Sequence, residues 1–300
     1  MWYLQESNQG HKDFQSFALP TELRYRILKC DKYKMVFRLQ QIIPNKNLLV
    51  FLIIVLNAIM NLVLDIGNTF SKYSVFDLDK IKHKGLWKSN DIVESFKKWI
   101  KENPRCKSII ISDVFGIETS ILESMTESRI VWVSNKIKLP FKLKYKSPGS
   151  LGADRLSLLA ATINKYPKKN SLIIDLGTCI TYDFIDKSGN YLGGSISPGF
   201  SLRYKSFKSF TKKLPELEFQ SSNKIMANST EDCIHSGVYF GILGEVKHQI
   251  SFYKEKYKNL TIILTGGDAD KLANKIKNGI FANHNFLAEG LYKLLKLNTE

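Results

Sequence analysis

Residues 65–72 hold the chemical groups of a phosphate-binding turn, in the order Asp-Ile-Gly-Asn-Thr-Phe-Ser-Lys. They directly follow the apolar run 62–64, so a short buried strand is predicted to end where the turn begins. Gly67 lets the backbone approach a ligand closely because it has no Cβ atom. The asparagine and threonine supply donors for phosphate oxygens, and the lysine adds a positive charge. Asp65 is suited to hold the hydrated metal ion that accompanies a triphosphate.

A second strand and turn of the same kind occur later in the chain. The apolar run 172–174 leads into Asp175, Gly177 and Thr178. A single Asp-x-Gly turn is more often structural than functional, but two copies favour a duplicated fold that holds a nucleotide between its halves. A third segment, Thr-Gly-Gly-Asp at 265–268, leaves open backbone against which an adenine or ribose can lie.

The turn Gly-Ala-Asp-Arg at 152–155 precedes a predicted helix. Asp154 could accept a proton from a hydroxyl group, and Arg155 could clamp an anionic substrate. The alternative is an ordinary surface ion pair at a helix cap. The glycines and the proline of 193–199 predict a loop soon after the second turn.

Short apolar runs alternate with longer periodic segments from Met60 onward, which is typical of an α/β fold. The predicted strands are 61–66, 72–77, 108–112, 130–133, 171–175, 180–185 and 260–265. The predicted helices are 91–103, 151–164, 229–257 and 286–297, with Ser229 as a helix cap and with 229–257 as either one long helix or a broken pair. We expect an N-terminal extension over 1–59, a first domain over 60–170 and a second over 171–300.

The composition, with 44% hydrophobic and 12% aromatic residues, is that of a globular protein. The four cysteines form no CxxC pair, which argues against a metal knuckle or a disulfide framework and favours the cytoplasm. The net charge of +16 could attract nucleic acid, membranes or small anions. Because the lysines occur in short scattered pairs and no arginine-rich recognition helix is evident, we expect no dedicated nucleic-acid site.

The apolar run 48–64 is at the lower edge of the length of a membrane-spanning helix, which needs roughly 20 residues. Its C-terminal part also belongs to the first predicted strand, which leaves still fewer residues for a span. We therefore expect residues 1–59 to be an appendage, with Met60 as an alternative start, and no membrane partner. A membrane anchor is the alternative.

From Met60 to the C-terminus the chain resembles the type III pantothenate kinases, members of the acetate and sugar kinase/Hsp70/actin superfamily. The resemblance implies a duplicated actin-like (ribonuclease H-like) ATPase fold, with two domains and the nucleotide in the cleft between them. It rests on motifs in a fixed order: 65–72, 151–155, 175–178, 191–199, Leu214-Pro215, Thr230, Ser236-Gly237, 265–268 and 289–291.

The resemblance implies ATP-dependent phosphorylation of pantothenate to 4'-phosphopantothenate, the first step towards coenzyme A. Asp154 would accept the proton of the pantothenate hydroxyl, and Asp175 would hold K⁺ or NH₄⁺. The ATP phosphates and Mg²⁺ would be bound by Asp65, Ile66, Gly67, Asn68, Thr69, Phe70, Ser71 and Lys72, with Thr178 also touching ATP. Pantothenate would be contacted by Tyr145, Gly152, Ala153, Asp154, Arg155 and Thr230. The family forms homodimers that complete the pantothenate pocket at their interface.

Two alternatives remain open at this point. One is a non-catalytic transcriptional accessory factor of the same family, which the net charge of +16 could support. The other is a different small-molecule kinase or a phosphatase of the superfamily. The presence of both phosphate turns and of Asp154 favours a kinase.

Overall fold

The computed structural model describes residues 60–77, 79–276, 279–282 and 284–300. The predicted extension 1–59, and with it the membrane-anchor interpretation of 48–59, lies outside these residues. Among the helices of the described part, none has both the length and the apolar character that crossing a bilayer requires.

The first half of the described chain forms a five-stranded sheet in the order β3-β2-β1-β4-β5. Strands β1, β4 and β5 are parallel to one another, whereas β2 is antiparallel to both of its neighbours. The elements are β1 (Met60–Ile66), β2 (Phe70–Asp77), β3 (Lys80–Lys88), η1 (Ser89–Asp91), α4 (Ile92–Glu102), β4 (Cys106–Asp113), α5 (Thr119–Glu123) and β5 (Arg129–Trp132).

The second half forms a six-stranded sheet in the order β11-β10-β7-β8-β9-β6. Its strands are β6 (Lys142–Leu143), β7 (Ser171–Leu176), β8 (Cys179–Ile185), β9 (Asn190–Pro198), β10 (Thr261–Thr265) and β11 (Ile280–Phe281). The helical segments are η2 (Pro148–Ser150), α6 (Ala153–Lys165), α7 (Phe200–Phe210), α8 (Thr230–Lys256), η3 (Ala269–Lys275) and α9 (Phe286–Thr299).

The two sheets repeat one topology. The series β7-β8-β9 of the second half is antiparallel like β1-β2-β3 of the first, and β7-β10-β11 is parallel like β1-β4-β5. Each Asp-x-Gly turn therefore joins the first two strands of its own copy. The predicted duplicated, actin-like α/β fold is confirmed by this repetition.

The central strands are buried on both faces, which explains their nearly continuous apolar sequences. In β1, Leu62 and Leu64 pack with Phe96 of α4, whereas Val63 belongs to the core on the opposite face. In the second sheet, Leu172 and Ile174 pack with α8, while Ile173 faces the other way. Each sheet is therefore covered by helices on both faces: α4 and α8 pack on the outer faces of the first and second sheets, and the inner faces share α6 and α9.

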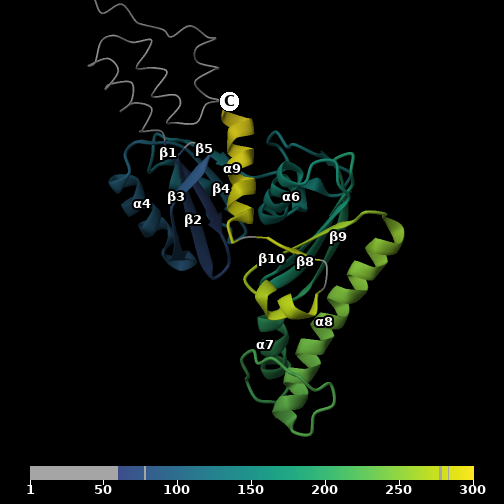
Figure 1. The fold of residues 1–300 in the computed structure, drawn as a ribbon. Coiled ribbons are helices and arrows are strands. Elements are labelled where there is room, and N and C mark those ends of the chain that lie inside the picture. The colour runs from purple at the N-terminus through teal and green to yellow at the C-terminus, as the bar shows by residue number, and fades with distance from the viewer. Residues whose placement is uncertain (1–59, 78, 277–278, 283) are drawn as a thin grey trace, which may run out of the picture. The chain divides into compact units, whose positions relative to one another are not determined.

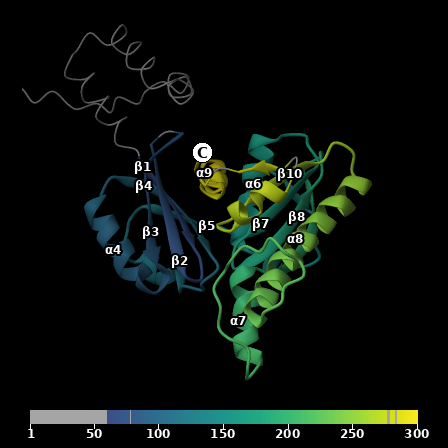
Figure 2. The ribbon, with the colours of Figure 1, turned by 60° about the horizontal axis from the view of Figure 1, so that its bottom comes forward.

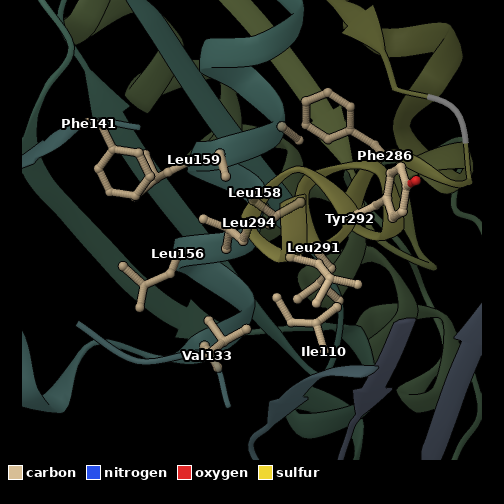
Figure 3. Packing of buried hydrophobic residues seen from close by; sticks show 14 of the residues in the cluster. Ile110, Val133, Phe141, Leu156, Leu158, Leu159, Phe286, Leu291, Tyr292 and Leu294 are labelled. Atoms are coloured by element: carbon tan, nitrogen blue, oxygen red, sulfur yellow. The ribbon is translucent and has the colours of Figure 1, made fainter. Parts of the chain in front are cut away.

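Helices α6 and α9 form the inner cover and lie between the two sheets (Figures 1 and 2). Gly290 of α9 allows them to approach closely, because a Cβ atom there would lie 2.0 Å from the carbonyl oxygen of Ser157. Figure 3 shows Leu158 of α6 and Leu291 of α9 in one apolar cluster with Ile110 of β4. This shared core links the two halves beneath the cleft.

All predicted strands and helices are present, but the loop predicted over 193–199 is wrong. Residues up to Pro198 belong to strand β9. Gly193 adopts a φ of +110° beside a register shift, and a Cβ on Gly194 would lie 1.6 Å from the carbonyl oxygen of Tyr182. These glycines permit a close approach between strands, a need that sequence alone does not separate from a loop.

Candidate active site

Both Asp-x-Gly turns open onto one cavity of about 690 Å³. The first turn contributes Asp65, Gly67, Asn68 and Lys72, and the second contributes Asp175, Gly177 and Thr178. The glycines of 265–268 and the start of α9 also line it. The structure thus brings together the three segments that the sequence predicts to contact a nucleotide.

Asp65 lies at the end of β1, where its neighbour on the parallel strand β4 is Ser112. The Ser112 hydroxyl donates a hydrogen bond of 3.0 Å to Oδ1 of Asp65. This bond fixes the orientation of the carboxylate at the cavity wall. Lys72 lies directly opposite Asp65 on the antiparallel strand β2, so a cation and a carboxylate flank the turn.

The first turn is held from beneath by Ser89, a buried residue at the end of β3. Its hydroxyl donates to the carbonyl oxygen of Gly67 at 2.6 Å and lies 3.0 Å from Oγ of Ser71. Its backbone N–H donates to the carbonyl oxygen of Thr69. Ser71 is therefore buried beneath the turn, and its hydroxyl faces Ser89.

The other members of the first predicted turn lie off the cavity wall. Ile66 is completely buried in the core with α4, while Thr69 is exposed and Phe70 keeps half of its surface accessible. Along 65–72 the cavity is therefore lined by Asp65, Gly67, Asn68 and Lys72 only.

The second turn depends on Gly266 of the Thr-Gly-Gly-Asp segment. This glycine has a φ of +94°, and a Cβ atom there would lie 2.3 Å from the carbonyl oxygen of Leu176 and 2.5 Å from Oδ1 of Asp175. Two residues later, the N–H of Asp268 donates to the same carbonyl at 2.9 Å. A residue without a side chain is needed here, because the backbone that follows β10 packs directly against Leu176 and the carboxylate of Asp175.

Asp154 reaches the same cavity from the first turn of α6. Its Oδ1 accepts a 2.7 Å hydrogen bond from the N–H of Arg155. Its neighbours in the predicted turn do not line the cavity: Ala153 is buried, and Gly152 is the helix cap. The predicted proton acceptor thus lines the same cavity as the two Asp-x-Gly turns.

The remaining predicted substrate residues lie in two other places. Arg155 is buried in an ion pair with Asp183 and also bonds Tyr191, on whose ring Tyr145 packs at 5.6 Å between centroids. Thr230 is exposed at the start of α8, where it lines a separate open hollow. Tyr145 and Arg155 are therefore close to each other, and Thr230 is apart from both.

Burial makes the cleft carboxylates weak acids. Desolvation raises the pKa of Asp65 to about 6, and raises the pKa of Asp175 to about 7 with help from the negative charges of Asp154 and Asp65. The pKa of Asp154 is raised as well, chiefly by burial and further by Asp183. Lys72 offsets part of this repulsion for Asp65 and Asp175. Such a cluster favours the binding of cations.

Protonation is expected to stabilise the cation-free protein below neutral pH. Because the folded-state pKa of Asp175 is about 7 against 3.8 in the unfolded chain, the folded state binds the extra proton between these values. The contribution to stability is complete below the lower value and is lost as pH rises through about 7. Thermal unfolding without added cations should show that the stability advantage of Asp175→Asn over the wild type is larger at pH 8 than at pH 5. A difference that is the same at both pH values would contradict this account.

The carboxylates are spread around the cavity. Within the described residues, no group of three or more His, Cys, Asp and Glu side chains could hold a metal ion alone. Mg²⁺ is commonly held by one or two carboxylates together with substrate phosphates, so the separated aspartates fit an ion that arrives with a nucleotide. The cavity can therefore hold a metal–nucleotide complex between two acidic turns.

Some lining or supporting residues are not evident from the sequence. Lys84 of β3 lines the cavity, and its Nζ donates to Oδ1 of Asn285 at 3.5 Å. Thr181 of β8 lines it opposite Asp175. Ser89 and Ser112 support the first turn from behind. Polar residues within or next to strands are too common in the sequence to single these four out.

The family model and the curated relatives that match this chain agree on one family. The family model described as type III pantothenate kinase matches residues 61–251. A type III pantothenate kinase of Christiangramia forsetii is 43% identical over 240 residues, which cover 80% of this chain and 99% of the relative. The corresponding protein of Bacteroides fragilis is 34% identical over 241 residues, 80% of this chain and 98% of the relative.

Solved structures agree with the fold. A structure from Campylobacter jejuni assigned to the Baf family of transcriptional activators covers 79% of this chain and 98% of its own, with a TM-score of 0.56 and 23% identity. A structure from Listeria monocytogenes assigned as an N-acetylmannosamine kinase covers 79% and 99%, with a TM-score of 0.50 and 13% identity. At these identities the likeness concerns the fold alone.

Proposed function

Since the chain belongs to the type III pantothenate kinase family, we propose that its cleft transfers the γ-phosphoryl group of ATP to the primary hydroxyl of pantothenate. The products are ADP and 4'-phosphopantothenate, the first intermediate on the way to coenzyme A. The observation that supports this most strongly is the meeting of two phosphate turns and Asp154 in one cavity. We assign the two turns to the nucleotide and the region next to Asp154 to the acceptor.

Asp154 is the proposed general base. The attacking hydroxyl oxygen forms a bond to the γ-phosphorus as the bond from that phosphorus to the β–γ bridging oxygen breaks. The hydroxyl proton passes to a carboxylate oxygen of Asp154, and ADP leaves. Phosphoryl transfer of this kind is accelerated mainly by alignment and charge neutralisation, so a base that is ionised and well placed suffices.

The first turn, with Lys72 and the nearby Lys84, is the proposed site of the ATP phosphates. Gly67 and Asn68 line the cavity there, and Thr178 lines it from the second turn. Asp65 is the proposed contact of Mg²⁺, which neutralises charge on the β- and γ-phosphates when it is bound. We place ATP between two domains, residues 60–170 and 171–300.

A monovalent cation, K⁺ or NH₄⁺, is proposed beside Asp175. The fit depends on Thr181, which lies directly opposite Asp175 on the paired strand, so that both side chains lie on the same face. The Thr181 Oγ1 atom is buried and has no hydrogen-bond partner among the described residues, although it borders the cavity. An unsatisfied buried hydroxyl beside a carboxylate provides the hard oxygen ligands that such a cation prefers.

Replacing Thr181 by Val should raise the K⁺ concentration for half-maximal activation by about tenfold, because the oxygen ligand is lost while the side-chain shape remains. Thr181→Ser is the matched control, since it keeps the hydroxyl and should stay close to the wild type. The measurement is initial rate against K⁺ concentration at saturating substrates. Equal activation curves for the two variants would remove Thr181 from the cation site.

We also propose a homodimer in which a second copy completes the acceptor pocket. Thr230 lies apart from Asp154 within one chain, yet the resemblance implies a contact with pantothenate. Large apolar side chains close in sequence to residues of its hollow are exposed, with Phe210 at 87% and Met226 at 86% accessibility. Light scattering at micromolar concentration should therefore give the mass of two chains.

Cys106, Cys179 and Cys233 carry free thiols, which suits a reducing compartment such as the cytoplasm.

A panel of acceptors tests the reaction. The full chain should phosphorylate pantothenate with Mg²⁺-ATP, as followed by mass spectrometry of the product, and should leave N-acetylmannosamine and hexoses unchanged. Phosphorylation of a sugar but not of pantothenate would move the assignment to another kinase of this fold.

A further inference from the structure

A buried ionic cluster lies next to the proposed catalytic base. Asp183 of β8 is completely buried, and the buried Arg155 of α6 forms a two-pronged ion pair with it. Arg155 Nε donates to Oδ1 at 3.0 Å and to Oδ2 at 3.2 Å, and Nη2 donates to Oδ1 at 2.7 Å. The Tyr191 hydroxyl joins the two partners, since it donates to Oδ1 at 2.8 Å and accepts from Nη2 at 2.8 Å.

This arrangement uses only part of the guanidinium group. Nε and Nη2 face the cluster, whereas Nη1 forms no hydrogen bond with the described part of the chain. In the described residues, a few side-chain atoms, such as Oγ of Ser171 and Oγ1 of Thr181, are fully buried without a hydrogen-bond partner. Nη1 of Arg155 has no partner there and is not one of these atoms, so a small part of its surface is accessible to solvent. The pKa of Arg155 is raised, because its hydrogen bonds with Asp183 outweigh its desolvation. One edge of a permanently charged, rigidly held guanidinium is therefore still open to an anion.

Arg155 does not itself line the cavity, but its neighbours connect the ionic cluster to the proposed acceptor region. Arg155 directly follows Asp154, whose carboxylate lines the cavity. The ring of Tyr145 packs on Tyr191 at the same cluster. Pantothenate carries a carboxylate at one end and its reactive hydroxyl at the other, so an acceptor whose hydroxyl meets Asp154 needs a cation elsewhere along its length.

We propose that Asp183 and Tyr191 are positioning residues that hold Arg155 in the orientation in which it binds the acceptor carboxylate. The inference rests on the proposed function and adds a specificity device to it. A free arginine side chain has many rotamers, and fixing it in advance removes the cost of ordering it when the substrate binds. The alternative is an ion pair that only fastens α6 to the second sheet.

A positioning role and a purely structural ion pair predict different effects on how well the protein distinguishes pantothenate from an uncharged analogue. Asp183→Asn removes the carboxylate that orients Arg155 while it preserves side-chain size. We expect KM for pantothenate to rise about tenfold, as the loss of one oriented hydrogen bond to a charged group implies. KM for ATP and the inhibition constant of pantothenol, in which the carboxylate is replaced by an uncharged alcohol, should change less than about twofold, since neither ligand uses the carboxylate subsite.

Two further variants keep the test valid if Asp183→Asn fails to fold. Tyr191→Phe keeps the ion pair and loses one hydroxyl, so it should raise KM for pantothenate in the same selective way by a smaller factor. Tyr182→Phe is the matched control, because that buried tyrosine on β8 also donates to a carboxylate, Glu245, but from the opposite face of the sheet. It should leave the ratio of the pantothenate and pantothenol constants unchanged.

Equal weakening of pantothenate and pantothenol by Tyr191→Phe or Asp183→Asn would overturn the inference and leave a structural ion pair. A lower KM for pantothenate in Asp183→Asn would also overturn it, since the carboxylate would then only repel the substrate. If the wild-type chain phosphorylates pantothenate, such results reject the positioning role alone. A wild-type chain that does not phosphorylate pantothenate would reject the proposed function as well.

Discussion

Replacing Asp154 by Asn is expected to lower kcat for pantothenate phosphorylation by about 10²- to 10⁴-fold, the usual contribution of a positioned general base. The asparagine has the same size and can still accept the 2.7 Å bond from the Arg155 N–H, but it cannot take the hydroxyl proton. Initial rates at saturating ATP and pantothenate measure the effect. The ATP dissociation constant should stay within a few-fold, because the two phosphate turns remain intact.

The control for Asp154→Asn is Glu94→Gln. Glu94 is an exposed acid in the first turn of α4, just as Asp154 lies in the first turn of α6. The control therefore removes a carboxylate that also lies in the first turn of a helix but does not line the cavity. It should leave kcat unchanged. An Asp154→Asn protein that turns over at the wild-type rate would show that Asp154 is not the base.

Replacing Gly266 by Ala should give the largest structural effect, a loss of about 2 kcal/mol or more in the free energy of unfolding. The φ of +94° already strains any residue with a Cβ, by about 1–2 kcal/mol. The new Cβ would also lie 2.3 Å from the carbonyl oxygen of Leu176 and 2.5 Å from the carboxylate of Asp175, so strand and side chain must shift. Urea unfolding measures the loss, and cation activation should weaken with it.

Gly267→Ala is the matched control for this substitution. Gly267 lines the same cavity, but a Cβ atom there meets no other atom within 4 Å. Its stability should differ from that of the wild type by less than about 0.5 kcal/mol, as at a site without packing constraints. Equal losses in Gly266→Ala and Gly267→Ala would show that the close approach to Asp175 is not what requires glycine.

The positions of the two Asp-x-Gly turns can be predicted from the sequence because the pattern that marks them is local. An apolar strand, a carboxylate and a glycine within a few residues suffice to locate Asp65 and Asp175, and repetition of the pattern predicts the duplicated fold. The confirmed helix from Thr230 is likewise local: the Ser229 side chain accepts a hydrogen bond from the N–H of Asp232.

The rest of the site depends on contacts between segments far apart in sequence. Ser89 supports the first turn only because β3 pairs with β2, and Thr181 reaches Asp175 only through the register of β7 and β8. The partner of Arg155 is the clearest case, since nothing near 152–155 indicates Asp183. Pairing of this kind is set by the tertiary fold, and a single sequence does not reveal it.

The most direct test of the central claim is the transfer of labelled γ-phosphate from ATP to pantothenate by the full chain, in Mg²⁺ with either K⁺ or Na⁺ as the monovalent cation. Labelled 4'-phosphopantothenate should form in K⁺ or NH₄⁺ and be far less abundant in Na⁺, and Asp154→Asn should abolish most of it. Folded protein that binds ATP and yields no labelled product in any cation would contradict the account.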